Sequence, residues 1–261
     1  MSRIKEAFGR GKAFIPFLTC GDPDLETTLE LCKAIEDAGA DLIELGIPFS
    51  DPIAEGPVIQ KASLRALSGG VTTDKIFDLV NKVRKTVRLP LLFMTYANVV
   101  FSYGTERFVK TATEIGIDGL ILPDVPFEEK GDFGHICKMC GLDLISFIAP
   151  TSHERISIIA QEAAGFIYCI SSLGVTGVRD KINPDIDKMI GLVRKSTTVP
   201  TAIGFGVSTQ EQAAKLAEKS DGVIVGSAIV KLIERYGRDA VPYVFNYAKK
   251  MKLAITKQIS I

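Results

Sequence analysis

The sequence predicts an α/β fold, a (β/α)8 TIM barrel that forms a single domain over residues 1–261, and three observations lead to this prediction. Short apolar runs recur roughly every 20 to 40 residues, with segments of helical length between them. A phrase ending in Asp recurs at several strand starts. The length of 261 residues suits one barrel of about 250 residues as well as two ordinary domains, but no linker or low-complexity tract marks a boundary.

Eight segments of four to six residues have the apolar, β-rich composition of strands buried on both faces of a parallel sheet. In chain order these predicted strands are Phe14–Thr19, Leu42–Ile47, Leu91–Thr95, Gly119–Leu122, Leu144–Ala149, Phe166–Ile170, Thr201–Gly204 and Gly222–Val225. Eight is the number of strands that such a barrel requires.

A repeated phrase leads into four of these strands. It reads Gly39-Ala40-Asp41, Gly116-Ile117-Asp118 and Gly141-Leu142-Asp143, with Ser220-Asp221 as a close relative. In each copy a small residue can end the preceding helix, and Asp starts a buried strand. Such a regular repeat of the same pattern before the strands favours a closed barrel over an open sheet.

The amphipathic segments between the strands predict outer helices, several with Asp, Ser or Thr near the start. These are Thr73–Thr86, Thr105–Ile115, Glu128–Cys140, Pro184–Ser196, Thr209–Lys219 and a last helix from Asp239 to Lys252. The uncharged stretch from Leu89 to Thr105 is interrupted by Pro90, Asn98, Ser102 and Gly104. We therefore expect a buried strand followed by a functional loop there, and no membrane span.

Composition narrows the possible functions. The 31 basic and 31 acidic residues balance, and no basic block is present, which argues against nucleic acid or an anionic membrane as a partner. The charged N-terminus lacks the apolar region of a secretory signal, so we expect a cytoplasmic protein. Five cysteines, an odd number, indicate reduced thiols.

Metal or redox chemistry finds little support in the residues. Cys137 and Cys140 form a single C-x-x-C, without a second pair or a nearby His, so packing on a helix face is favoured over metal binding or redox work. His135 and His153 are the only two histidines, too few for a zinc site or a His-based nucleophile to be expected.

Glu44 lies inside the otherwise apolar second strand. A carboxylate there should face the barrel mouth, because burial in the core would cost several kcal/mol, and burial should raise its pKa toward the range used in proton transfer. The alternative is a structural carboxylate paired with a buried cation, but the neighbouring strands supply no obvious one. Catalysis is therefore favoured, with Asp51 and Glu55 in the Pro-rich loop that follows as further candidates.

Glycine-rich turns follow the last three predicted strands. They contain Gly174 to Gly177, Gly206, and Gly226 with Ser227. Glycines let backbone N–H groups approach an anion, and phosphate sites after the seventh and eighth strands recur in this fold. Each turn alone is explained by a tight connection, but the three together predict a substrate with a phosphate group.

Taken together, these motifs resemble those of a known family, the alpha subunit of tryptophan synthase. The resemblance covers nearly the whole chain and is carried by the motif from Glu44 to Pro57, by Tyr96-Ala97-Asn98, by Pro123-Asp124-Val125-Pro126 and by the glycine turns. It implies cleavage of indole-3-glycerol phosphate to indole and glyceraldehyde 3-phosphate, a lyase reaction of tryptophan biosynthesis. The resemblance also implies that no metal, Schiff base or cofactor takes part, pyridoxal phosphate belonging to the beta partner in an alpha2-beta2 complex.

The resemblance assigns the proton transfers to two carboxylates. Glu44 would act as the acid/base at the ring carbon and the side-chain hydroxyl. The family's second carboxylate is normally Asp in an Ala-Asp-Gly-Pro phrase, and here Glu55 takes that place in Ala54-Glu55-Gly56-Pro57. The extra methylene extends its reach by about 1 Å, and a shift of that size can cost about a hundredfold in rate. We expect the loop to compensate; the competing reading is a poor lyase that serves mainly as a partner module.

The resemblance sorts the remaining site residues into three groups. The pocket around the substrate would comprise Phe17, Met94, Ile121, Tyr168 and Thr176, although core packing explains most of these equally well. Phosphate would be bound at Gly177, Gly206, Gly226 and Ser227. The segments facing the beta subunit would carry Pro48, Asp51, Asn98 and Pro126.

Two rival functions stay open from the residues. One is another phosphate-binding barrel enzyme, such as an indole-glycerol-phosphate synthase or a phosphoribosyl isomerase, but no lysine occupies the predicted strand interiors. The other is a non-catalytic activator of the beta subunit.

Overall fold

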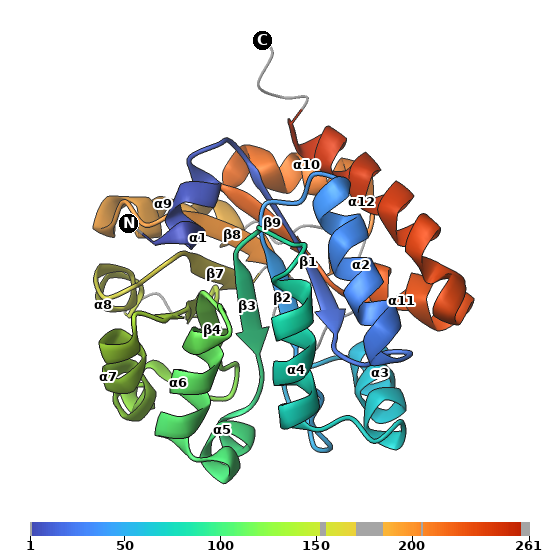
Figure 1. Ribbon diagram of the computed structural model, residues 1–261. Helices are drawn as coiled ribbons and strands as arrows, with labels where there is room; N and C mark the ends of the chain where they lie inside the picture. The colour runs from blue at the N-terminus through green and yellow to red at the C-terminus, as the bar shows by residue number, and fades with distance from the viewer. Residues whose placement is uncertain (1, 152–154, 171–184, 205, 257–261) are drawn as a thin grey trace.

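The computed structural model describes residues 2–151, 155–170, 185–204 and 206–256. Nine parallel strands form one sheet in the order β5-β4-β3-β2-β1-β9-β8-β7-β6, with helices around it (Figure 1). The strands are β1 Ala13–Thr19, β2 Ile43–Gly46, β3 Leu91–Met94, β4 Gly119–Ile121, β5 Asp143–Leu144, β6 Ser146–Ile148, β7 Ile167–Ile170, β8 Thr201–Gly204 and β9 Gly222–Val225. All eight predicted strands are present, with ends shifted by at most one residue.

The sheet closes into a barrel through its fifth predicted strand. That segment is divided into β5, which pairs with β4, and β6, which pairs with β7. Only Ile145 separates the two, and its N–H donates to the carbonyl of Leu120 at 2.9 Å. One continuous stretch of chain therefore joins the two edges of the sheet, so the predicted (β/α)8 barrel is confirmed.

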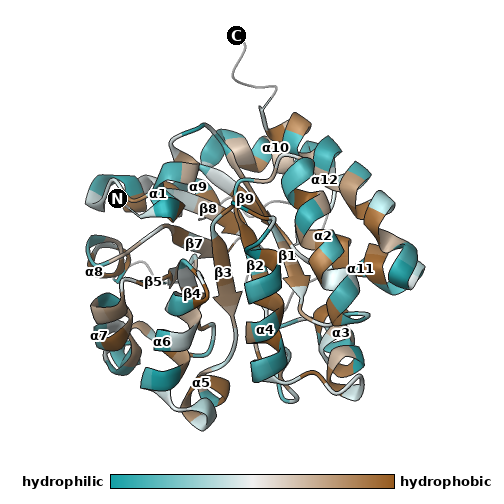
Figure 2. Ribbon diagram, viewed as in Figure 1, coloured by the Kyte–Doolittle hydropathy of each residue, from teal (hydrophilic) through white to brown (hydrophobic). Residues whose placement is uncertain are grey.

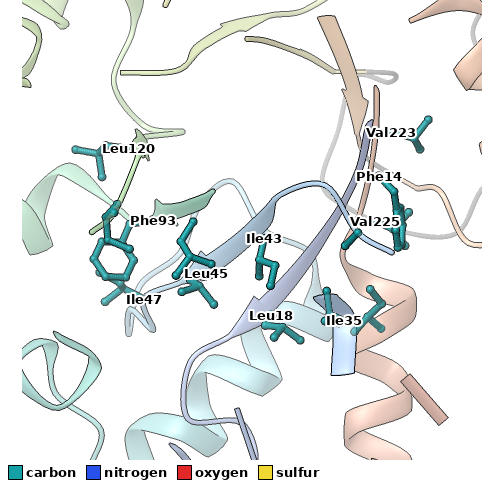
Figure 3. Packing of buried hydrophobic residues seen from close by; sticks show 14 of the residues in the cluster. Phe14, Leu18, Ile35, Ile43, Leu45, Ile47, Phe93, Leu120, Val223 and Val225 are labelled. Carbon is teal, nitrogen blue, oxygen red and sulfur yellow. The ribbon is translucent and has the colours of Figure 1, made fainter. Parts of the chain in front are cut away.

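The strand side chains alternate between the helices and the barrel interior. Figure 3 shows the side that faces the helices, where Phe14, Ile43, Leu45 and Phe93 pack in one buried cluster. A second cluster fills the barrel and includes Ile15, Phe17, Leu92, Met94 and Tyr168. Figure 2 shows apolar strands at the centre and helices that carry both polar and apolar residues around them.

The repeated Asp residues connect neighbouring strands at their N-terminal ends. The carboxylate of Asp41 accepts the Phe14 N–H at 2.7 Å, and Asp118 accepts the Leu91 N–H at 2.9 Å. Asp221 accepts the Thr201 N–H, also at 2.9 Å. In each case the Asp that leads into one strand binds the N–H of the first or second residue of the strand beside it. Asp143 differs, because it accepts the Ser2 hydroxyl.

The helices surround the barrel (Figure 1). They are α1 Arg3–Phe8, α2 Leu25–Asp37, α3 Pro57–Ser68, α4 Thr73–Val83, α5 Ala97–Tyr103, α6 Thr105–Glu114, α7 Gly131–Cys140, α8 Ile156–Gln161, α9 Asp185–Ser196, α10 Gln210–Lys219, α11 Ser227–Tyr236 and α12 Val241–Thr256, with 3-10 turns η1 Phe127–Glu129 and η2 Gly237–Ala240. Capping explains several starts: Thr72 accepts the Lys75 N–H before α4, and Thr209 and Gln212 form a capping box at α10.

One element was predicted wrongly. The functional loop expected after β3 is instead the helix α5, which ends at Tyr103. Asn98 and Gly104 lie at its first turn and immediately after its end, where polar and glycine residues are favoured. Two of the four interrupting residues thus mark the ends of a helix, whereas Pro90 precedes β3 and Ser102 lies inside α5. None of the helices among the described residues combines the length and the apolar character that crossing a membrane requires.

Candidate active site

Glu44 projects from β2 into the barrel interior. It lies beside Phe17 of β1 and Leu92 of β3 in the strand register, and both of these belong to the interior cluster. Its neighbours Ile43 and Leu45 face the helices, so the two-residue period places Glu44 inside. Only 1% of Glu44 is exposed, and its Oε2 has no hydrogen-bond partner among the described residues.

The environment of Glu44 favours its neutral form. Burial, and after it the nearby Glu55 carboxylate, raises the pKa of Glu44 to about 8. Among the described residues, no ion pair involves Glu44. A buried acid without a cation is suited to hold and release a proton near neutral pH.

Glu55 lies on the loop between β2 and α3. It is 8% exposed, and burial raises the pKa of its carboxyl group to about 7. Glu44 and Glu55 line the same cavity. Because each negative charge disfavours the other, the two groups titrate as a pair. The pair can therefore hold one proton and one charge together near neutral pH.

The cavity that contains the two acids lies at the carboxyl ends of the strands. Its wall is formed by Phe17, Glu44, Ala54, Glu55, Ile59, Met94, Tyr168, Gly206, Val207, Ile224, Gly226 and Ser227. One side is therefore acidic and apolar. The wall also carries Gly206 and the start of α11 at Gly226 and Ser227, where N–H groups of a first helical turn have no partner within the helix.

Two glycines make room for the aromatic rings of this cavity. A Cβ on Gly46 would lie 2.5 Å from the Phe17 ring, and one on Gly204 would lie 2.6 Å from the Tyr168 hydroxyl oxygen. Any side chain at either position would displace the ring beside it. Burial, and after it the charge of Glu44, raises the pKa of Tyr168 well above its usual range, so its hydroxyl stays protonated.

The cavity with the acids is not the largest one. It encloses about 40 Å³, whereas a neighbouring cavity of about 490 Å³ is lined by residues that include Ile53, Asp124, Lys130 and Phe147. We place the candidate site in the smaller cavity, because only that one combines paired acids with a glycine-lined wall. About 40 Å³ holds roughly one water molecule, so an indole ring requires the surrounding side chains to move.

Most of the predicted site residues meet in this cavity. Glu44, Glu55, Phe17, Met94, Tyr168, Gly206, Gly226 and Ser227 line it. Ile121 is buried in the adjoining interior cluster and does not line the cavity wall. Thr176 and Gly177 lie outside the described residues. The sequence prediction missed Ala54, Ile59, Val207 and Ile224, which are apolar side chains that nothing in the sequence separates from the core.

The predicted partner residues lie around the same end of the barrel. Pro48 and Asn98 line a groove of about 320 Å³ between the loop after β2 and α5, and Pro126 lines the 490 Å³ cavity. Asp51 is exposed and accepts the Ser50 hydroxyl. Two large apolar side chains are exposed nearby, Ile53 on the same loop and Phe101 on α5.

The described residues contain no group of His, Cys, Asp and Glu side chains that could hold a metal ion. Cys137 is buried in α7, and its burial raises the pKa of the thiol to about 12. His135 is exposed on the same helix, and His153 lies outside the described residues. A thiol with this pKa is protonated and unreactive at neutral pH.

Comparisons with known proteins give one family. The family model described as "Tryptophan synthase alpha chain" matches residues 4–256. A tryptophan synthase alpha chain of Lacticaseibacillus casei is 44% identical, over 100% of this chain and 99% of the relative. One of Halalkalibacterium halodurans is 50% identical, over 89% of each chain.

Solved structures agree with these relatives. A tryptophan synthase chain of Mycobacterium tuberculosis superimposes with a TM-score of 0.90 at 31% identity, covering 97% of this chain and 98% of the other. A chain from a structure described as the tryptophan synthase a2b2 complex of Pyrococcus furiosus has a TM-score of 0.86 at 35% identity, covering 93% and 98%.

Proposed function

The chain belongs to the tryptophan synthase alpha chain family, whose members cleave indole-3-glycerol phosphate to indole and glyceraldehyde 3-phosphate, and we propose that Glu44 and Glu55 carry out the proton transfers of this reaction. The observation that carries the proposal is the presence of two buried carboxyl groups with raised pKa values in one cavity, whose wall also includes the glycine-lined start of α11. The chain is therefore a lyase, and acid/base catalysis by these two residues is the proposed mechanism.

The reaction needs a proton on the indole ring carbon and removal of one from the side-chain hydroxyl next to it. The bond between the indole ring carbon and the side-chain carbon that bears the hydroxyl then breaks. This leaves an aldehyde on the phosphate-bearing fragment. Glu44, with its pKa of about 8, is protonated at neutral pH and donates to the ring carbon. The resulting carboxylate accepts the hydroxyl proton, so Glu44 ends the cycle as it began.

Glu55 acts on the indole nitrogen. Its lower pKa, about 7, leaves it largely ionised when Glu44 is still protonated. A carboxylate that accepts a hydrogen bond from the N–H stabilises the positive charge that develops on the ring when its carbon is protonated. Because the pair holds one proton near neutral pH, one acid can donate while the other accepts a hydrogen bond.

The phosphate group of the substrate binds at Gly206, Gly226 and Ser227. Backbone N–H groups at the start of α11 and the Ser227 hydroxyl provide the donors. Thr176 and Gly177 are proposed to complete the site on the resemblance alone. No cofactor is required for this chemistry, and pyridoxal phosphate is assigned to the beta subunit of the family.

Members of this family assemble with a beta subunit, as in the a2b2 complex of Pyrococcus furiosus. We assign the docking surface to the end of the barrel that carries Pro48, Asp51, Asn98 and Pro126. Exposed Ile53 and Phe101 on the same segments support this assignment, since apolar side chains at an interface gain from being covered. Indole released at Glu55 would emerge beside this surface.

The proposed roles are tested by measuring indole release with saturating beta subunit for wild type, Glu44→Gln, Glu55→Gln and Glu55→Asp. We expect Glu44→Gln to lower kcat by about 10²- to 10⁴-fold, as loss of a general acid does. Glu55→Gln should also lower kcat, and Glu55→Asp should lower it by about tenfold or more because the loop is fitted to the longer side chain. A Glu55→Gln variant with wild-type indole release would remove that residue from the mechanism.

A further inference from the structure

The backbone that carries Glu55 is bound on both sides by side chains outside the proton-transfer pair. The Tyr96 hydroxyl oxygen accepts the Ala54 N–H at 3.0 Å. The Gln60 side-chain amide donates to the carbonyl of Glu55 at 2.9 Å. Both ends of the two-residue segment 54–55 are therefore hydrogen-bonded, one to Tyr96 at the N-cap of α5 and one to Gln60 in α3.

Tyr96 is itself held rigidly. Only 2% of it is exposed, and its ring stacks on Phe49 with centroids 5.1 Å apart. The next N–H, that of Ala97, donates to both carboxylate oxygens of Asp124 at 3.1 Å. The start of α5 is thus tied to the loop after β4, and the Tyr96 hydroxyl cannot drift from the Ala54 N–H without disturbing these contacts.

Gln60 connects Glu55 to the first turn of α3. Its backbone N–H donates to the Gly56 carbonyl at 3.0 Å, and its side chain turns back to the Glu55 carbonyl. A carbonyl can only accept, so the nitrogen of the Gln60 amide must face it. By contrast, the Ile53 side chain just before this segment is 75% exposed.

Given the proposed role of Glu55, on which this inference rests, we propose that Tyr96 and Gln60 are positioning residues that clamp the backbone around Glu55 and thereby place its carboxylate. A Glu side chain has one more rotatable bond than Asp, so its carboxylate explores more positions from a loose backbone. A fixed backbone removes part of that freedom. The clamp is how this loop accommodates the longer acid.

The test is single-turnover cleavage of indole-3-glycerol phosphate by the isolated full-length chain. Tyr96→Phe keeps the ring and removes the acceptor, and Gln60→Met keeps the length and removes the donor. Each should lower the cleavage rate by about 10- to 100-fold while the substrate concentration at half-saturation changes by less than about threefold. Tyr103→Phe, which removes a hydroxyl bond to Asp74 from the same helix, is the matched control and should cleave at the wild-type rate.

A double-mutant cycle distinguishes positioning from general damage. In a Glu55→Gln background, Tyr96→Phe and Gln60→Met should cause no further loss, because the group that they position is already inactive. The proposal would be overturned if Tyr96→Phe and Gln60→Met lowered the cleavage rate equally in both backgrounds, or if the single variants cleaved at the wild-type rate. The proposed function fails separately, if wild type releases no indole or if Glu55→Gln cleaves as fast as wild type.

Discussion

Glu44 lowers the stability of the fold at alkaline pH, because its carboxyl group is buried and forms no ion pair among the described residues. The pKa of about 8 in the folded chain exceeds the ordinary value of about 4.3 for an unfolded Glu. Between these values the folded chain holds the extra proton, so its free energy of unfolding falls as the pH rises. The loss in the free energy of unfolding is fully present above about pH 8 and disappears below about pH 4.

This linkage predicts the behaviour of Glu44→Gln. The substitution keeps the shape and removes the charge, so the variant should be more stable than wild type at pH 8.5, by on the order of 2 kcal/mol. Near pH 4.5 the two should have similar stability. Urea unfolding at both pH values measures the difference, and a variant that is less stable than wild type at pH 8.5 would contradict the unpaired burial of Glu44.

The pair of acids also predicts a bell-shaped pH dependence of kcat/KM. Activity should fall below about pH 7 as Glu55 gains a proton, and above about pH 8 as Glu44 loses one. Because the groups are coupled, the two limbs belong to the pair. In Glu55→Gln the acidic limb should disappear from the residual activity. A wild-type rate that climbs steadily to pH 9.5 would be incompatible with Glu44 as the acid.

At this scale the sequence was informative where a residue broke a local pattern. Glu44 was identified because an acid in an apolar strand with no neighbouring cation needs an explanation. Glu55 emerged as a specific departure from the family phrase. Tyr96 and Gln60 were not predicted as site residues, because each acts through a hydrogen bond to a backbone group, and a sequence does not show which backbone group a side chain will reach.

Among the elements, the strand-starting Asp residues stabilise the end of the barrel opposite the candidate site. Asp118 accepts Leu91 N–H and forms a 2.7 Å ion pair with Arg84, whose guanidinium also donates to the carbonyls of Leu89 and Gly116. Side chains of both partners are mostly buried, at 15% and 12% exposure. Removal of the carboxylate leaves a buried cation without its counter-charge.

We therefore expect Asp118→Asn to lower the free energy of unfolding by about 3 kcal/mol, with single-turnover indole release unchanged at temperatures where the variant is folded. Glu106→Gln is the matched control, because its pair with Lys110 is exposed and spans one helical turn; it should have little effect. Urea denaturation gives both values. A loss of catalytic rate in folded Asp118→Asn would show that this network reaches the site.

Helices and strands could be predicted from the sequence where the local residue composition alone determines them. All eight strands follow from short apolar runs, because both faces of a barrel strand are buried. The division of the fifth strand into β5 and β6 depends on pairing with two different neighbours, which no local pattern encodes. The helix α5 was read as a loop because Asn98 and Gly104 were taken for interruptions, although they mark its first turn and its end.

For the whole molecule, the exposed apolar loop residue Ile53 offers a test of the docking surface. Ile53→Asp should weaken binding of the beta subunit by tenfold or more, because a charge would be buried at the interface. Met139→Asp is the matched control: Met139 is 74% exposed on α7, against 75% for Ile53. Titration of each variant with the beta subunit measures the affinity, and equal binding by both would place the interface elsewhere.

The family and its reaction could be predicted from ordered motifs along nearly the whole chain. The arrangement of two cavities at one end of the barrel could not, because cavity size depends on side-chain packing. The small volume around Glu44 and Glu55 implies that substrate entry rearranges this end of the molecule. The proposed docking surface lies at the same end, so a beta subunit bound there would contact the loop after β2 that carries Glu55.

The most direct measurement is a single-turnover experiment with indole-3-glycerol phosphate, comparing wild type and Glu44→Gln, both fully folded, at pH 7.5. If a buried acid in the barrel supplies the proton to the indole carbon, wild type forms indole and the variant is slower by at least about 100-fold, with substrate still bound. Equal rates of indole formation in the two proteins would contradict the account.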